Sequence, residues 1–462
     1  MGRWKETSPR LYACVYNYGR VRLFLGLTKT LAFFVNMLYN EGMEVQYKRK
    51  KRYNTGKKPI RQPLYLTGLI WVLSRFALIG KKRKIEKINM EGLKPPYMIL
   101  SNHMSFLDFE LTAMATWPHR VNNVVNVDGY IKRAWLMEWI GSVCTRKFTT
   151  DLKLVRSISL VLKRGDILCM YPEARYSPCG VTSYLPPSLG KIIKKNKAPV
   201  VAVVHRGNHL VSPFWNFRKK RKVPLHTTLT QILTKEDIER MSVDEINAVV
   251  KESLTYDDYK YQKENGILIK EKFRAEGLHR ILYQCPHCKT EFKMDSKGTE
   301  IFCEECGKRW NLNEDGSLSA LEGETEFPHI PDWFEWERQQ VEAEVRSGNY
   351  RYEDEVDVFS LPRTQGFTKL GKAKISHDIE NGWVIEGHYN GSDYRIQRKP
   401  LEMNSLHVEY DYYRIRRDDC YDISTEKDSF YCYPTREKKI VTKLAFATEE
   451  IYKLALEQRE QK

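Results

Sequence analysis

Residues 98–110 read MILSNHMSFLDFE, an apolar stretch that runs directly into Asn-His, with an aspartate five positions after the histidine. The apolar residues are typical of a buried strand that ends at Ser101-Asn102, and the residues after them are typical of the first turn of a helix. A strand that ends in this way brings His103 and Asp108 close together, which is one way to build a general base. The motif is short, so the rest of the chain must decide its meaning.

Strand-like and helix-like segments alternate from about residue 97 to residue 225. In such α/β folds the carboxyl ends of neighbouring strands meet at one edge of a mostly parallel sheet, where sites form. His103 and Glu173 both fall at such ends. We expect strands at 97–102, 121–127, 166–173 and 198–207, and helices at 106–117, 132–141 and 152–165.

The charge of the chain is divided unevenly along its length. Of 462 residues with a net charge of +17, the first 225 contain 41 Lys+Arg against 12 Asp+Glu, and the remainder contains 35 against 47. A basic first half is typical of a protein that meets an anionic partner, such as a phospholipid surface, a phosphorylated substrate or a nucleic acid.

Two apolar segments near the start, 31–40 and 62–74, are too short to span a bilayer comfortably. Both lie beside basic runs (48–52, 57–61 and 81–84), as interfacial helices that bind anionic lipid headgroups do. The sequence therefore predicts an interfacial, membrane-docking pair of helices within residues 1–90; two ordinary core helices are the alternative. The first twenty residues show no secretory signal, and most of the cysteines lack disulfide-like spacing, which favours a reducing cytosol.

A second motif, YPEARYS at 171–177, follows the strand expected at 166–173. Together with NHMSFLD at 102–108, it resembles the glycerolipid acyltransferases of the lysophosphatidate acyltransferase superfamily, which have N-H-x4-D and F-P-E-G-T-R-S motifs. The resemblance covers roughly residues 20–255. It implies an α/β acyltransferase domain (91–260) that docks on the cytoplasmic face of the cell membrane as a peripheral or monotopic protein.

The resemblance also implies roles for individual residues. His103 would take the proton from a glycerol hydroxyl that attacks an acyl thioester, and Asp108 would orient and stabilise the imidazole. Glu173 matches the substrate-site glutamate of the family, and Arg175, Arg146 and Lys147 are the candidate cations for a substrate phosphate. The sequence contains no G-x-S-x-G nucleophile elbow, which agrees with direct attack.

The chain departs from the family pattern at the second motif. Ala174 and Arg175 stand where the family has Gly and Thr, and Tyr176 stands where it has Arg. A prolyl position in a later family block is occupied by Ala202. These differences indicate a divergent branch and affect the substrate assignment more than the reaction class.

The spacing C-x2-C-x14-C-x2-C is typical of a zinc ribbon, in which two thiolate pairs surround one ion. It predicts structural Zn²⁺, because no coordination position is left open, bound by Cys285, Cys288, Cys303 and Cys306. Residues 277–318 contain 6 Lys+Arg against 7 Asp+Glu, so nucleic-acid binding is not expected, and a fold-stabilising or protein-docking role is favoured.

The rest of the chain predicts further structure around this ribbon. Helices are expected over 230–254 and 332–348, and 366–434 has the short aromatic and β-branched segments of an antiparallel sheet. A carboxyl-terminal helix is expected over about 439–459. The predicted organisation is a membrane-docking region (1–90), the acyltransferase domain (91–260), a zinc ribbon (277–320) and a β-rich domain with a carboxyl-terminal helix (366–462).

From these features we expect an O-acyltransferase that converts lysophosphatidate into phosphatidate in phospholipid biosynthesis. Another lysolipid or glycerol 3-phosphate is the alternative acceptor, and acyl-CoA or acyl-acyl carrier protein is the donor. The alternative of a different class is an inactive, membrane-docked zinc-ribbon interaction protein. The sequence leaves open the acyl-chain preference, the role of residues 366–462 and the oligomeric state.

Overall fold

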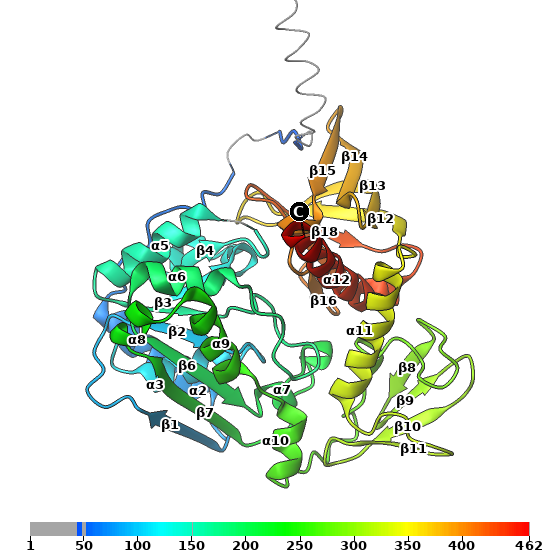
Figure 1. Cartoon of the computed structure of the whole chain (residues 1–462), viewed down its shortest axis with the longest axis horizontal. Helices are drawn as coiled ribbons and strands as arrows, with labels where there is room; N and C mark the ends of the chain where they lie inside the picture. The colour runs from blue at the N-terminus through cyan, green and yellow to red at the C-terminus, as the bar shows by residue number, and fades with distance from the viewer. Residues whose placement is uncertain (1–43, 49–51, 150, 462) are drawn as a thin grey trace, which may run out of the picture.

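A seven-stranded, mostly parallel sheet forms the first half of the protein (Figure 1). The computed structural model describes residues 44–48, 52–149 and 151–461. The strands run in the order β1-β7-β6-β2-β5-β3-β4, and every neighbouring pair is parallel except β6 and β7. They are β1 (Arg83–Ile88), β2 (Met98–Ser101), β3 (Val121–Asn126), β4 (Val143–Thr145), β5 (Ile167–Met170), β6 (Val200–Arg206) and β7 (Leu225–Leu233).

Helices cover both faces of this sheet, because consecutive residues of a buried strand point to opposite sides. Met98 and Leu100 of β2 pack against Ile158 and Ile193 on one face. Ile99 packs with Ala115 on the other face. The first face carries α5 (Leu152–Lys163), α6 (Ser188–Asn196), α8 (Lys235–Arg240) and α9 (Val243–Leu254); the second carries α3 (Asp108–Thr116), with α2 (Leu64–Ala77) packed on it.

Three shorter helices complete the described part of this half, and one predicted helix in it differs from the structure. They are α4 (Ala134–Trp139), α7 (Asn208–Val211) and α10 (Asp258–Glu264). The expected helix at 230–254 is wrong at its start, because Thr230–Leu233 continue β7 and pair with β6. The mostly parallel α/β class itself is confirmed.

The second half contains two antiparallel sheets (Figure 1). The smaller has the order β11-β10-β9-β8, and the larger has the order β15-β14-β13-β12-β18-β17-β16. The strands are β8 (Met294–Lys297), β9 (Glu300–Cys303), β10 (Arg309–Leu312), β11 (Leu318–Ala320), β12 (Tyr352–Ser360), β13 (Thr368–Asp378), β14 (Gly382–Tyr389), β15 (Ser392–Arg398), β16 (His407–Glu409), β17 (Cys420–Ser424) and β18 (Ser429–Tyr433).

Two long helices, α11 (Ile330–Arg346) and α12 (Val441–Glu460), pack against each other beside the larger sheet. Both were expected from the sequence. The larger sheet begins earlier than expected, at Tyr352 rather than near 366, because the acidic strand β12 alternates buried and exposed residues in register with β13.

One continuous apolar core joins the two halves. It includes Trp215 from the first half, Trp310 from the smaller sheet, and Trp333 and Phe446 from the long helices. Trp310 and Trp333 meet edge to face with their ring centroids 5.0 Å apart. The smaller sheet and the carboxyl-terminal part therefore stabilise the α/β half directly.

Of the expected pair of amino-terminal helices, the segment at 31–40 lies outside the described residues, and the segment at 62–74 corresponds to α2. Within the described part of the chain, no helix combines the length and the apolar character needed to cross a membrane.

Candidate active site

His103 and Asp108 form a hydrogen-bonded pair at the carboxyl end of β2. Their Nδ1 and Oδ2 atoms are 2.9 Å apart. Asp108 begins α3, is 1% exposed, and also accepts hydrogen bonds from the backbone N–H of Met104 (2.7 Å) and the side-chain amide of Asn208 (2.7 Å). Because Asp108 accepts from Nδ1, the Nε2 atom is the nitrogen that remains to take a proton.

The electrostatics of the pair suit a neutral base beside an ionised carboxylate. Burial lowers the pKa of His103 below its ordinary value of 6.5, and Asp108 opposes this shift. Burial alone would raise the pKa of Asp108, but the hydrogen bond from His103 and the other groups around the carboxylate outweigh it, so the pKa lies below 3.8. At neutral pH the imidazole is therefore ready to accept a proton.

The carboxylate of Glu173, in the loop after β5, accepts hydrogen bonds from two backbone N–H groups, one of them that of His103. Its Oε1 accepts from the backbone N–H of His103 (3.1 Å), and its Oε2 accepts from the backbone N–H of Ser183 (2.8 Å). Burial raises the pKa of this carboxyl to about 7. Its neighbour Ala174 has φ 54°, in the left-handed region that favours glycine. In this structure Glu173 holds the backbone, and its role as a substrate ligand stays a prediction.

Two tyrosines of the second motif enclose the imidazole of His103. Tyr171 stacks on it at a centroid distance of 4.1 Å, and Tyr176 packs against it at 4.0 Å. The side chain of His103 is 18% exposed. Phe106, which contacts Tyr176 at 4.8 Å, is 52% exposed and marks the open side of the site. The sequence analysis did not predict this aromatic enclosure. The one local sign of it was Tyr176, which stands where the resembled family has an arginine.

The three predicted phosphate-binding cations all contact the carboxyl-terminal part of the chain. The guanidinium of Arg146 donates to the carbonyl oxygen of Leu361 (3.2 Å) and to Oγ of Ser429 (2.8 Å). Arg175 pairs with Glu449 of α12 at 2.6 Å. The structure brings His103, Asp108 and Glu173 together and directs the two arginines elsewhere.

Lys147 is held in a similar way by a second histidine–aspartate pair. Its Nζ donates to Nε2 of His407 (2.5 Å), and Nδ1 of His407 donates to Asp422. Glu409 lies 3.7 Å from Nε2 of His407, and burial raises the pKa of this carboxyl to about 8. Nothing in the sequence pattern indicated that β16 and β17 reach this position.

The four predicted zinc ligands converge in the smaller sheet unit. Their Sγ atoms lie within 4.8 Å of one another, and the Cys285–Cys306 and Cys288–Cys303 pairs are both 3.7 Å apart. Four thiolates at about 2.3 Å from a tetrahedral Zn²⁺ are about 3.8 Å from each other, so the group fits this ion. The fit supports one structural zinc.

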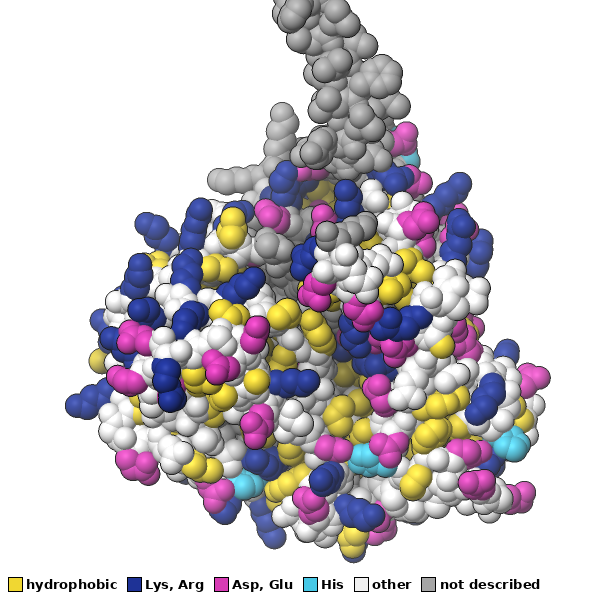
Figure 2. All heavy atoms as spheres, in the orientation of Figure 1, with side chains coloured by type: hydrophobic (Ala, Val, Ile, Leu, Met, Phe, Trp, Pro, Cys, Tyr) yellow, Lys and Arg dark blue, Asp and Glu magenta, His cyan; other side chains and the backbone are white. Residues whose placement is uncertain are grey.

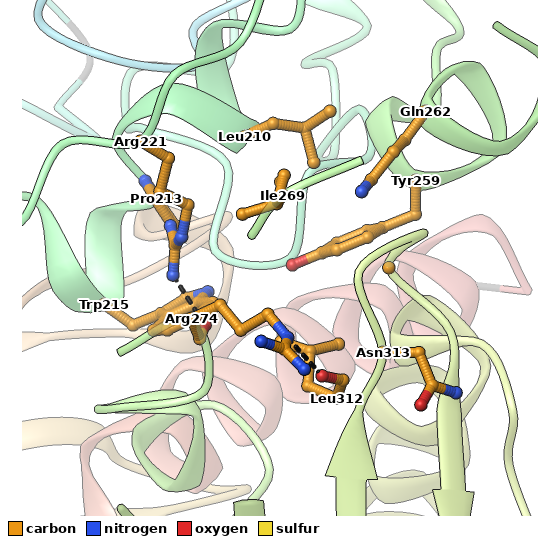
Figure 3. A pocket seen from close by; sticks show the side chains of 11 residues that line it. Leu210, Pro213, Trp215, Arg221, Tyr259, Gln262, Ile269, Arg274, Leu312 and Asn313 are labelled. Carbon is orange, nitrogen blue, oxygen red and sulfur yellow. Dashed lines mark hydrogen bonds between the residues drawn. The ribbon is translucent and has the colours of Figure 1, made fainter. Parts of the chain in front are cut away.

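The ribbon is fastened to the α/β half around a small cavity (Figure 3). Its volume is about 20 Å³, which is room for about one water molecule. Arg221 donates to the carbonyl of Arg274 (2.7 Å), and Arg274 donates to the carbonyl of Leu312 on β10 (2.5 Å). The cavity is therefore part of the packing between the two units.

A much larger cleft, of about 1210 Å³, lies between the α9–α10 side of the α/β half and α11, near the middle of the face drawn in Figure 2. Arg206, Lys251 and Lys260 lie on one of its walls. Arg175, Pro178 and Phe334 line both the cleft and a small apolar cavity behind Tyr176. The cleft therefore reaches the cavity behind Tyr176, the residue that packs against His103.

Comparisons with known proteins give only a distant likeness among solved structures. No protein-family model matches the chain, and no curated protein matches it. Among solved structures, the chain is similar to the crystal structure of the 1-acyl-sn-glycerophosphate acyltransferase PlsC from Thermotoga maritima, with 16% sequence identity and a TM-score of 0.35, over 41% of this chain and 77% of that chain.

Proposed function

We propose that this protein is an O-acyltransferase that moves an acyl group from a thioester to the hydroxyl of a lipid at a membrane surface. The observation that carries the proposal is the His103–Asp108 pair, 2.9 Å apart at the carboxyl end of a central parallel strand. Asp108 is fixed by backbone N–H groups and by Asn208, so it holds the imidazole in one tautomer.

The reaction needs one proton acceptor and no covalent intermediate. Nε2 of His103 takes the proton of the acceptor hydroxyl as its oxygen attacks the thioester carbonyl. The C–S bond then breaks, and the imidazolium returns the proton to the leaving thiolate. Asp108 stabilises the imidazolium between these steps, and such positioned acid–base catalysis contributes about 10²–10⁴-fold in rate.

The exposed face of α2 is suited to a membrane surface. Tyr65, Leu69, Leu73 and Phe76 share one side of this helix, and all are exposed; Phe76 is 64% exposed. Apolar side chains of this kind bury themselves among lipid headgroups, and the basic runs at 57–61 and 81–84 flank the helix at both ends. We place the membrane against this face.

Aromatic side chains border this face, as they do in membrane-interface belts. The ring centroids of Tyr65 and Trp139 are 6.0 Å apart, and those of Trp71 and Trp117 are 5.3 Å apart. Since α2 packs on α3, whose first residue is Asp108, a lipid hydroxyl would have a short path from the membrane to His103 past Phe106.

The donor is proposed to occupy the large cleft on the other side of the sheet. Its volume of about 1210 Å³ is larger than that of most small-ligand pockets, which leaves room for a bulky donor, and Lys251 and Lys260 offer positive charge for a phosphorylated carrier. Acyl-CoA and acyl-acyl carrier protein both end in a phosphopantetheine arm, so either fits this description. Lysophosphatidate is the acceptor that the sequence resemblance implies, with other lysolipids and glycerol 3-phosphate as alternatives.

The test is acyl transfer from radiolabelled palmitoyl-CoA and palmitoyl-acyl carrier protein to a panel of hydroxyl acceptors in vesicles. Wild type is compared with His103→Ala and with the matched surface control His226→Ala. Label in a lipid product with wild type and His226→Ala but not with His103→Ala is the expected result. Equal, negligible transfer from all three folded proteins would instead favour a membrane-docked interaction protein without activity.

A further inference from the structure

The cations that should bind an acceptor phosphate are already used by the fold. Glu449 accepts from Arg175, from Arg338 and from Oγ of Ser405, and all of these groups are buried or nearly so. Arg146 is buried against Leu361 and Ser429. A phosphate would have to compete with Glu449 for Arg175, which also lines the large cleft, and with Leu361 and Ser429 for the buried Arg146.

Several carboxyl groups lie near the imidazole. Asp108, Glu110, Asp128 and Glu409 all raise the pKa of Tyr176, the residue that packs on His103. Against them stands Lys147, which opposes protonation of His103 and is itself hydrogen-bonded to His407. A phosphate group beside His103 would therefore meet the ionised carboxylate of Asp108, whereas Glu409, with a pKa of about 8, is mostly protonated at neutral pH.

The open side of the site is made of aromatic rings. The ring of Phe106 contacts the rings of Tyr176 and of Phe217, the latter at a centroid distance of 5.7 Å. The ring of Tyr176 in turn contacts that of Phe214 at a centroid distance of 5.1 Å. The small cavity behind Tyr176 is also mostly apolar, with Phe214, Tyr410 and Phe446 in its wall. Such a surface favours hydrocarbon. Two cations border it: the guanidinium of Arg218 lies 5.5 Å from the centre of the Phe217 ring, and Arg175 lines the small cavity.

We infer that the acceptor is an uncharged lipid alcohol, such as a monoacylglycerol or a long-chain alcohol, rather than a lysolipid that carries a phosphate. This inference rests on the proposed acyl transfer and names its acceptor class. Tyr176 is the residue that sets the preference, because it fills the space beside His103 with an uncharged ring where the resembled family has an arginine.

The experiment measures kcat/KM for four acceptors with one saturating donor: 1-oleoylglycerol, hexadecanol, lysophosphatidate and lysophosphatidylcholine. The expected result is a preference of at least tenfold for the two uncharged alcohols. Tyr176→Arg should reduce that preference at least tenfold relative to wild type. Tyr389→Arg adds the same charge on β14, far along the larger sheet from β16, and should leave the preference unchanged.

Equal or better use of either phosphate-bearing acceptor by the wild type would overturn the inference while leaving the acyltransferase intact. Binding of the same four lipids without donor is measured in parallel by calorimetry. Selective binding of the uncharged alcohols, with no transfer from any donor, would remove the proposed reaction and keep the recognition. Circular dichroism and thermal unfolding of each variant show whether a changed preference reflects a folded protein.

Discussion

Arg175 and Glu449 form a buried ion pair, with 2.6 Å between guanidinium and carboxylate, that joins the loop after β5 to helix α12. Arg338 of α11 shares the same carboxylate. The loop that carries Tyr176 and Glu173 is therefore fixed by the carboxyl-terminal part of the chain. This gives residues beyond 330 a direct role in shaping the site of an α/β domain that ends near residue 264.

Glu449→Gln should be strongly destabilising, because it leaves the buried guanidinium of Arg175 without its carboxylate and removes one partner of the half-buried Arg338. Removing one partner of a buried pair typically costs about 3–5 kcal/mol of the free energy of unfolding. The matched control is Glu457→Gln on the same helix, whose exposed pair with Arg346 should contribute less than about 1 kcal/mol. Urea unfolding of both variants measures the difference, and equal losses would show that the buried pair has no special weight.

The effect of Glu449→Gln should shrink in acid. Burial would raise the pKa of Glu449, but Arg175 and Arg338 outweigh it and hold the value at about 2, below the ordinary 4.5. A depressed pKa stabilises the fold above the unfolded value and loses that contribution as the pH falls towards the folded value. The difference in unfolding free energy between wild type and variant should therefore be full at pH 6 and decrease between pH 4.5 and pH 2. A constant difference over this range would contradict the ion-pair account.

Acyl transfer should be lost on acidification with a midpoint below pH 6.5. Burial holds the pKa of His103 under that value, and a general base works only in its neutral form. The pH dependence of kcat/KM measures this limb. Glu173 has a raised pKa of about 7, so Glu173→Gln shows which group causes the acid loss of activity. If the midpoint is unchanged in Glu173→Gln, the titrating group is His103. If the acid loss disappears in this variant, the titrating group is Glu173.

The features that the sequence predicted correctly are those encoded by neighbouring residues. The strand at Met98–Ser101 and the helix that begins at Asp108 follow from local apolar and polar patterns, and the four cysteines come in two tight pairs. Strand β1 was missed because RKIEKI is a charged edge strand that pairs only with β7. Strand β12 was missed because its alternating acidic residues conceal a buried face.

The assignment of the cations depended on contacts that no local pattern contains. Arg175 meets Glu449, and Lys147 meets His407, from segments more than 200 residues away along the chain. A basic residue beside a catalytic motif is equally compatible with a phosphate ligand and with a structural ion pair until its partner is known. The position of Tyr176 against His103 could not be read from the sequence for the same reason.

Zinc removal should destabilise the whole protein rather than the ribbon alone. The ribbon shares its core with the α/β half and with the long helices, through Trp310 and Trp333. We expect one zinc per chain by elemental analysis and a single unfolding transition that moves to lower temperature after chelation or in Cys303→Ser. The control is Cys169→Ser, a buried cysteine outside the cluster, which should keep its zinc. Full zinc loading of Cys303→Ser with unchanged stability would contradict the assignment.

Replacing the exposed apolar side chains of α2 by acids should weaken membrane binding without affecting the fold. Phe76 is 64% exposed, so Phe76→Glu disturbs little buried surface, but it removes an apolar group that the proposed orientation buries in the headgroup region. A side chain of this size contributes about 2 kcal/mol when buried, which corresponds to roughly a 30-fold loss in vesicle binding.

Leu321→Glu, a comparable change at an exposed leucine of the ribbon unit, is the control and should bind like wild type. Co-sedimentation with vesicles of phosphatidylcholine and phosphatidylserine, at low and high salt, measures both variants. The flanking basic runs should make wild-type binding weaken as salt rises. Equal binding of Phe76→Glu and wild type would place the membrane contact on another surface.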